Sequence, residues 1–193
     1  ARSSDVVFKI EDKTMIFATV GTQLPFDRLL SGLDAWARRN PQIPVFAQIG
    51  VSARRFSSIE QVAQLSQADF QRQTKAARLI VSHAGMGTIL SAAELGKPII
   101  LMPRRAKFNE HRNDHQLDTA AQMKRLSNVT VADDGEALHQ ALDLAVARGF
   151  EAQGSGTSGG AELGSLINVI RDFVWTGAAQ PNVAYLRRRE KAA

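Results

Sequence analysis

The residues best suited to chemistry stand in one short run, Ser82-His83-Ala84-Gly85-Met86-Gly87-Thr88. Apolar stretches flank this run, so its two glycines are expected to form a turn between a strand and a helix. The start of a helix offers unpaired backbone N–H groups and the positive end of the helix dipole, which together can hold a diphosphate. Gly85 and Gly87 leave room for such a ligand, and the Thr88 hydroxyl adds a donor.

The turn differs from the common nucleotide motifs. No Lys follows Gly87 as in a P-loop, and Leu90 stands where the dinucleotide fingerprint has its third glycine. The alternative interpretation is that the glycines only permit a tight turn. Charge-assisted hydrogen bonds could hold the ligand without a metal. His111 and His115 are four residues apart but lack nearby Cys and a third ligand, so no metal site is predicted.

The elements that would position this turn can be read from the apolar patterning. Runs of apolar residues predict strands, and apolar residues at spacings of three and four predict helices between them. Alternating strands and helices with short connections predict an α/β fold, a doubly wound parallel sheet of the Rossmann-like kind. The strands are expected at 15–20, 45–50, 59–65, 79–82, 99–102 and 129–131, and the helices at 26–40, 69–77, 87–95, 113–124 and 136–147.

Ligands of such sheets bind beyond the carboxyl ends of the strands. Gly21, Thr22, Gly50, the 83–88 turn and the 104–116 loop all follow predicted strands, so they should share one edge.

Composition limits the classes of function. The chain has 193 residues, of which 44% are hydrophobic, and it contains no Cys, which fits one domain in a reducing cytoplasm. No apolar stretch is long enough to span a bilayer, and no leader is recognised. The formal net charge of +5 comes with only one Tyr and two Trp, so anionic substrates or lipids are favoured over nucleic acid.

The ends of the chain differ from its middle. Residue 1 is not Met and Met15 begins a strand, so residues 1–14 are interpreted as a tag remnant or an upstream segment. Residues 15–148 form the predicted domain. The Gly- and Ser-rich residues 149–161 are expected to be a flexible linker, residues 162–175 an amphipathic helix that packs on its own domain or docks on a partner, and residues 176–193 a basic, disordered tail.

Four motifs in order resemble glycosyltransferase family 28, in its C-terminal, donor-binding half. They are Phe17-Ala18-Thr19-Val20-Gly21-Thr22 with Phe26-Asp27 and Gln48-Ile49-Gly50, the 82–88 run, Gly96-Lys97-Pro98, and Asp114-His115-Gln116. Within that family the chain is similar to the small soluble subunits of two-part enzymes, both the subunit that adds N-acetylglucosamine to a dolichol-linked precursor and bacterial exopolysaccharide counterparts. The resemblance covers about residues 15–148 and implies one half of a GT-B glycosyltransferase.

The resemblance implies roles for individual residues. The backbone around Met86 and Gly87 and the Thr88 hydroxyl would hold the diphosphate of a UDP-sugar, and Gln116, assisted by His115, would bind the sugar hydroxyls. Independently of the resemblance, His83 follows a strand directly before the glycines, where an imidazole could donate to phosphate or cap the helix. The donor-binding residues expected in total are Gly21, Thr22, His83, Gly85, Met86, Gly87, Thr88, Glu94, Arg105, Glu110, His115 and Gln116.

One position departs from the family pattern. Many relatives carry a ribose-binding Glu where this chain has Ser91, so Glu94 or Glu110 is expected to take that role, unless Glu94 is simply solvated. In the basic loop, Arg104, Arg105 or Arg112 would meet the phosphates, or the carboxylate of a uronic acid donor; the alternative is a solvated loop.

The resulting expectation is a donor-binding subunit of an inverting glycosyltransferase. It would bind UDP-glucuronate, UDP-glucose or UDP-N-acetylglucosamine without cofactor or metal, and a membrane-associated partner would supply the lipid-linked acceptor and the catalytic base. The subunit would be cytoplasmic, held at the inner face of the membrane by that partner. The alternatives are a non-catalytic nucleotide-sugar-binding module, a sugar-nucleotide epimerase and a nucleic-acid-binding module.

Overall fold

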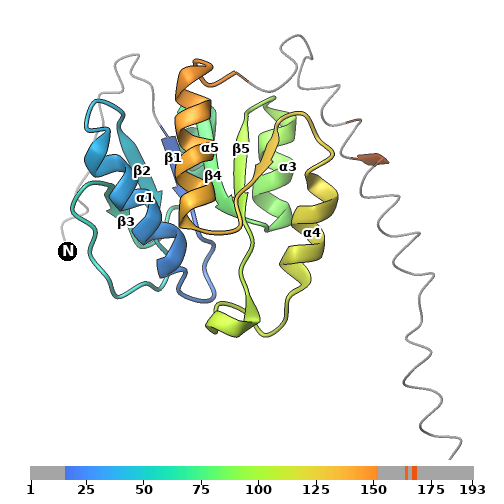
Figure 1. Ribbon diagram of the computed structural model, residues 1–193, viewed down its shortest axis with the longest axis horizontal. Helices are drawn as coiled ribbons and strands as arrows, with labels where there is room; N and C mark the ends of the chain where they lie inside the picture. Colours follow the sequence, from blue (N-terminus) through green and yellow to red (C-terminus); the bar gives the residue numbers. More distant parts are fainter. Residues whose placement is uncertain (1–15, 152–163, 165–166, 169–193) are drawn as a thin grey trace, which may run out of the picture.

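The computed structural model describes residues 16–151, 164, 167 and 168, and residues 16–151 fold as one α/β unit (Figure 1). The unit contains the six strands and five α-helices that the sequence predicts, with an α-helix after every strand except β2. The strands are β1 (Ile16–Thr19), β2 (Val45–Gln48), β3 (Glu60–Val62), β4 (Leu79–His83), β5 (Ile99–Met102) and β6 (Val129–Val131). The helices are α1 (Asp27–Arg39), α2 (Gln67–Ala76), α3 (Met86–Glu94), α4 (His115–Met123) and α5 (Gly135–Ala147), with a 3₁₀ turn, η1 (Ala106–Phe108), in the basic loop.

The strands form a single parallel sheet in the order β3-β2-β1-β4-β5-β6. The chain builds outward from β1 to β3, then returns to the other side of β1 with β4. The strand order therefore reverses between β1 and β4, and in doubly wound sheets this reversal opens a crevice where ligands bind. The predicted doubly wound, Rossmann-like architecture is confirmed.

Each central strand buries side chains on both faces of the sheet. Ile16 and Ala18 of β1 pack toward α1 and α5, whereas Phe17 between them packs with Phe46 and Phe70 on the other face. This alternation explains why the strand sequences are continuously apolar, because helices cover both faces. Figure 1 shows α1 and α5 crossing one face together; the apolar residues of α3 and of the end of α4 pack on the other face, over β4, β5 and β6.

The Gly96-Lys97-Pro98 motif has a structural role in this fold. The Lys97 ammonium donates hydrogen bonds to the carbonyls of Lys75 (2.9 Å) and Ala77 (2.7 Å), at the end of α2. Carbonyls at a helix end lack intrahelical donors, so a Lys placed there satisfies them and opposes the helix dipole. Burial, followed by the nearby Arg78 charge, lowers the pKa of Lys97. The motif joins the amino-terminal edge of the sheet to α2, on the side away from the predicted site.

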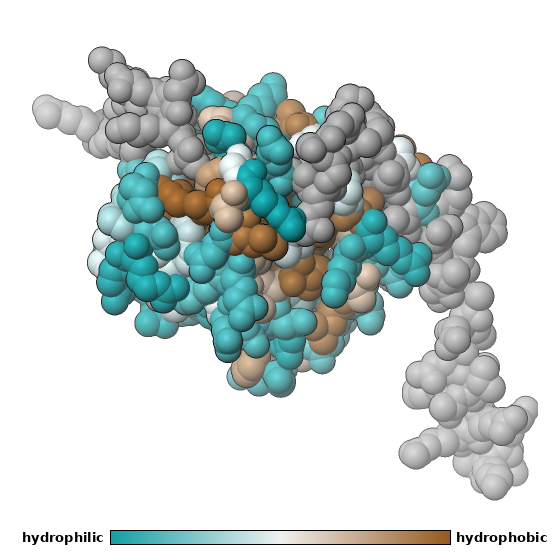
Figure 2. All heavy atoms as spheres, turned by 45° about the horizontal axis from the view of Figure 1, so that its top comes forward, coloured by the Kyte–Doolittle hydropathy of each residue, from teal (hydrophilic) through white to brown (hydrophobic). Residues whose placement is uncertain are grey.

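Figure 2 turns the top of Figure 1 toward the viewer, and apolar atoms reach the surface in the middle of a mostly hydrophilic face. Within the described part of the chain, no helix is long and apolar enough to cross a membrane.

Of the expected helix at 162–175 the structure describes Gly164, Ile167 and Asn168, all helical. The segment 1–14, most of the linker and the basic tail lie outside the described residues, so those assignments stay predictions.

Candidate functional site

A pocket of about 360 Å³ opens at the carboxyl edge of the sheet, beyond the ends of the neighbouring strands β1 and β4, where the strand order reverses. It brings together the loop after β1, the turn before α3, the start of the loop after β5, and the first turns of α4. Seven of the predicted donor-binding residues line it. The lining residues are Val20, Gly21, Thr22, Gln23, Leu24, His83, Ala84, Gly85, Met86, Arg104, His111, His115, Gln116 and Thr119.

The start of α3 faces this pocket with unpaired donors. The first hydrogen bond of the helix runs from the Ile89 N–H to the Gly85 carbonyl (3.3 Å), so the N–H groups of Met86, Gly87 and Thr88 precede it. No side chain caps the helix. Gly87 is exposed, and a Cβ built on it meets no atom within 4 Å. The turn therefore has the geometry expected of an anion site, with the helix dipole aimed at the ligand.

The His83 ring lies between Gly21 and Gly85, and all three residues line the pocket. A Cβ added to Gly85 would lie 2.1 Å from Cε1 of the His83 ring, and one added to Gly21 would lie 2.9 Å from Nε2. Gly21 also has a φ of +75°, which favours glycine. The His83 imidazole therefore requires a glycine at both positions.

The surroundings of His83 keep its ring neutral. Burial, followed by the positive charge of Arg104, lowers the pKa of His83 from 6.5 to about 4. The alternative expectation that His83 caps α3 is wrong, because the helix has no side-chain cap and the ring contacts Gln116 instead.

The buried Arg104 side chain holds several backbone segments together. Its guanidinium donates hydrogen bonds to four backbone carbonyls, those of Val20 (2.6 Å), Leu24 (2.8 Å), Pro25 (2.8 Å) and Glu110 (3.0 Å). Burial lowers its pKa to about 10, with the Glu110 charge opposing the shift, so the group stays charged at neutral pH. Because these donors are already used, Arg104 contributes its charge to the pocket and fixes the loops, which differs from the expected direct contact with phosphate.

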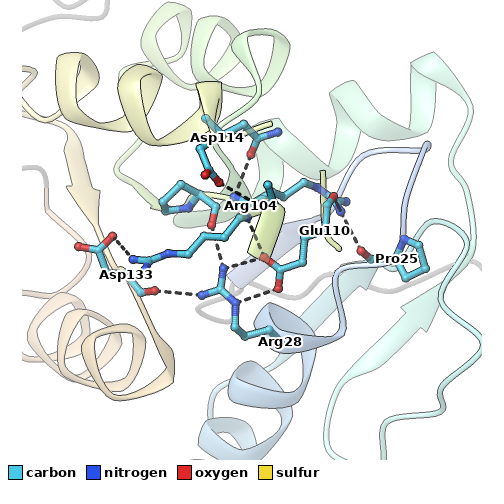
Figure 3. Close-up of polar contacts among 10 residues, drawn as sticks. Pro25, Arg28, Arg104, Glu110, Asp114 and Asp133 are labelled. Atoms are coloured by element: carbon cyan, nitrogen blue, oxygen red, sulfur yellow. Dashed lines mark hydrogen bonds and ion pairs between the residues drawn. The ribbon is translucent and has the colours of Figure 1, made fainter. Parts of the chain in front are cut away.

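Glu110 and Arg105, two of the predicted donor-binding residues, are occupied by other partners. The Glu110 carboxylate accepts two hydrogen bonds from Arg28 of α1 (2.8 and 2.9 Å) and a third from the Arg105 N–H (3.0 Å). Figure 3 shows Arg28 and Glu110 pointing toward one another, with Arg28 also reaching the Asp133 carbonyl. The Arg105 guanidinium pairs with the Asp133 carboxylate (2.9 Å). Neither Glu110 nor Arg105 lines the pocket.

Glu94 lies at the opposite end of α3 from the glycine turn. At a rise of about 1.5 Å per residue, its backbone is about 12 Å from that of Met86. The hypothesis that it replaces the ribose-binding Glu finds no support in this placement. Ser91, one turn after Gly87, is partly buried and donates its hydroxyl hydrogen to the Gly87 carbonyl (3.0 Å).

Among the pocket residues absent from the predicted donor-binding set, Thr119 and His111 carry polar side chains from α4 and the loop before it. Thr119 lies one turn after His115 on α4, and this i, i+4 spacing was the available signal. His111 comes from the loop, and its ring lies 4.4 Å from that of His115 in an edge-on contact. Only the fold shows that His111 reaches the pocket. Among the residues that the structure describes, no three His, Asp or Glu side chains form a group that could hold a metal ion.

Fold and pocket together define the class of protein: a Rossmann-like α/β domain whose fold matches halves of GT-B glycosyltransferases, with a pocket at the switch point of the sheet. The chain matches the glycosyltransferase family 28 C-terminal domain over residues 15–153. It belongs to that family, and is accordingly a sugar-donor-binding domain of a glycosyltransferase.

Solved structures share this fold at low sequence identity. ALG13, solved by NMR, is 15% identical with a TM-score of 0.52, and the match covers 77% of this chain and 92% of ALG13. MurG from Acinetobacter baumannii is 20% identical with a TM-score of 0.53, over 73% of this chain and 44% of MurG. A UDP-GlcNAc 2-epimerase from Neisseria meningitidis is 10% identical with a TM-score of 0.56, over 84% of this chain and 45% of the enzyme. The chain thus spans less than half the length of the last two.

Proposed function

We propose that this chain binds the UDP-sugar donor of an inverting glycosyltransferase. The observation that carries the proposal is the pocket at the β1/β4 switch point, where the free N–H groups of α3 meet three histidines and the buried Arg104 charge. No Asp or Glu stands among the described residues that line it. Such a set of donors suits a ligand with two negative charges.

The choice of nucleotide and sugar rests on the family. Uridine diphosphate carries the sugar in the relatives that the sequence resembles, and Gln116 and His115 lie at the pocket where the sugar hydroxyls would be bound. Glucose, N-acetylglucosamine and glucuronate are the candidate sugars. Glucuronate would need a cation near its carboxylate, and Arg105 is held by Asp133 outside the pocket, which leaves the charge of the buried Arg104 for that role.

The acceptor and the catalytic base are proposed to come from a membrane-associated partner. Inverting transfer needs a base on the acceptor hydroxyl, and His83, the most enclosed of the pocket's histidines, has a pKa of about 4, which makes it a weak base. The likeness in size to ALG13, of which the match covers 92%, supports a chain that works with a second subunit. A cytoplasmic location at the inner face of the membrane is part of the proposal only because that partner would hold the chain there.

The proposal is tested by calorimetric titration of the full chain with UDP, UDP-glucose, UDP-N-acetylglucosamine, UDP-glucuronate and a GDP-sugar. Uridine nucleotides should bind more tightly than the GDP-sugar, and the purified chain should transfer little sugar until a partner fraction and lipid-linked acceptor are added. Robust transfer by the chain alone would contradict the division of labour. Binding of no nucleotide, with or without partner, would remove the central claim.

A second candidate is a non-catalytic nucleotide-sugar-binding module, which would use the same pocket. The likeness to a UDP-GlcNAc 2-epimerase keeps sugar-nucleotide epimerisation as a further alternative, although this chain spans 45% of that enzyme. Release of UDP with a new glycosidic bond in the reconstituted mixture identifies the transferase. Epimerised UDP-sugar or unchanged substrate identifies one of the alternatives.

A further inference from the structure

Gln116 joins two parts of the pocket through its side-chain amide. It lies in the first turn of α4, is 4% exposed, and its Oε1 accepts a hydrogen bond from the backbone N–H of Arg104 (3.1 Å). Its Nε2 lies 3.3 Å from Nδ1 of His83. The amide therefore bridges the loop after β5 and the end of β4.

The contact with Arg104 decides which way the amide faces. A backbone N–H can only donate, so the amide atom opposite it must be the oxygen, and the NH₂ group must then face His83. That NH₂ group can only donate, so Nδ1 of His83 must accept. A neutral imidazole carries one proton, and with Nδ1 as acceptor this proton is on Nε2.

The backbone at Arg104 is held firmly enough to impose this choice. The guanidinium of the same residue is anchored by four carbonyls, from Val20, Leu24, Pro25 and Glu110. The Cζ atom of Arg104 also lies 4.6 Å from the centroid of the Phe26 ring, and this cation–π contact adds a further restraint. The backbone N–H that orients Gln116 therefore has little freedom to turn away.

Nε2 of His83 lies against Gly21 and Gly85, two glycines that line the pocket. It sits 2.9 Å from the position of a Cβ on Gly21 and 2.8 Å from that of a Cβ on Gly85, and both glycines line the pocket. Nε2 has no hydrogen-bond partner among the described residues, whereas Nδ1 has Gln116. A proton on Nε2 would thus be available beside the N–H groups of α3.

We propose that Gln116 is a positioning residue: held by the Arg104 N–H, it fixes His83 as the Nε2–H tautomer and so directs one more donor at the anionic part of the ligand. This role is separate from any contact between Gln116 and the sugar. It rests on the proposed function for the identity of the ligand, but the tautomer is a property of the free protein.

The tautomer is measured by long-range ¹H–¹⁵N NMR of the full-length, ligand-free protein at pH 7, with His83 assigned by the signals lost in His83→Gln. The expected pattern is that of Nε2–H. An Nδ1–H pattern would overturn the proposal, and this measurement needs no variant of Gln116.

The decisive variant is Gln116→Glu, which keeps the shape of the side chain and one oxygen for the Arg104 N–H. Its second oxygen faces Nδ1 as an acceptor, so the proton should move to Nδ1 or a second proton should be bound, and the NMR pattern should change. UDP affinity, measured by calorimetry, should fall about tenfold. UDP lacks the sugar that would be transferred, so this loss cannot come from a missing contact to the hydroxyls of that sugar.

Gln122→Glu is the matched control, since it places the same change later on α4 and away from the pocket. It should leave both the His83 pattern and UDP affinity unchanged. If Gln116→Glu kept the wild-type pattern, or changed it with no effect on UDP affinity, Gln116 would not position His83 for the ligand. If the wild-type protein bound no UDP but showed Nε2–H, the proposed function would fail while the tautomer assignment stood.

Discussion

Gly85 and Gly87 of the turn are glycines for two different reasons. Gly85 is required by the His83 ring, since a Cβ there would lie 2.1 Å from a ring carbon. Gly87 has open space around its Cα, so nothing in the protein requires a glycine at this helical position. The difference suggests that Gly87 is there for the approach of a ligand, because glycine inside a helix costs stability.

The Gly87→Ala variant should therefore change the stability of the protein and its affinity for UDP in opposite directions. The helix should gain stability, by up to about 1 kcal/mol, because Ala is the better helix former. UDP affinity should fall, because the new methyl group occupies the approach to the N–H groups of α3. Urea unfolding and calorimetry measure the two effects.

Gly135→Ala, in the first turn of α5, is the control for this prediction, because a Cβ there also meets nothing within 4 Å. It should change stability in the same direction and leave UDP affinity unaltered. Equal UDP binding by Gly87→Ala and wild type would mean that the turn does not contact the diphosphate.

His83 should make stability depend on pH. Its pKa is about 4 in the folded protein and about 6.5 in the unfolded chain, so between these values the unfolded chain binds more protons. The free energy of unfolding should thus decrease as the pH falls from 6.5 to 4, by up to about 3 kcal/mol from this residue.

The comparison of wild type with His83→Gln isolates this contribution from that of the carboxylates. In urea unfolding at pH 7.5 and pH 4.5, the stability advantage of wild type over the variant should shrink at the lower pH. An advantage that is the same at both pH values would show that His83 is not buried as a neutral ring.

At the scale of elements, the loop after β5 is anchored to α1. Arg28 joins the Glu110 carboxylate to the carbonyls of Pro103 and Asp133, so one guanidinium connects α1, the basic loop and the segment after β6. This arrangement explains why a long polar loop holds a defined shape at the rim of the pocket.

Glu110→Gln should loosen this loop. The variant leaves the guanidinium of Arg28 without its carboxylate, which should reduce the free energy of unfolding by about 2–3 kcal/mol. Glu94→Gln makes the same chemical change at an exposed helix end and should alter stability by less than about 0.5 kcal/mol. Urea unfolding measures both, and equal effects would show that the Arg28 pair contributes nothing specific.

UDP titration of the same two variants addresses ribose binding. Neither residue lines the pocket, so a direct loss of UDP contacts is expected from neither. A large loss of affinity in Glu94→Gln, with stability unchanged, would restore Glu94 as the ribose ligand.

At the scale of the whole molecule, the site and the apolar core occupy different parts of one parallel sheet. Helices cover both faces, and the carboxyl edge, where the strand order reverses between β1 and β4, presents polar loops. The matched family and the similar structures share this architecture. Stability can thus be maintained by the core while the loops at the edge vary, which is how one fold serves different ligands.

The sequence determined the elements, because apolar periodicity follows directly from which side chains a strand or helix must bury. It also indicated the site, since glycines, hydroxyls and histidines that follow parallel strands must meet at one edge. Seven of the predicted donor-binding residues line the pocket for this reason.

Only the tertiary structure decided which polar residues face the pocket and which form ion pairs with other side chains instead. Arg105 and Glu110 have the right chemistry for a donor site, yet Asp133 and Arg28 hold them, and those partners are 28 and 82 residues away. His111 looked like part of an isolated pair and instead lines the pocket beside His115. Local pattern cannot reveal such pairings, because they depend on loops that the folded sheet brings together.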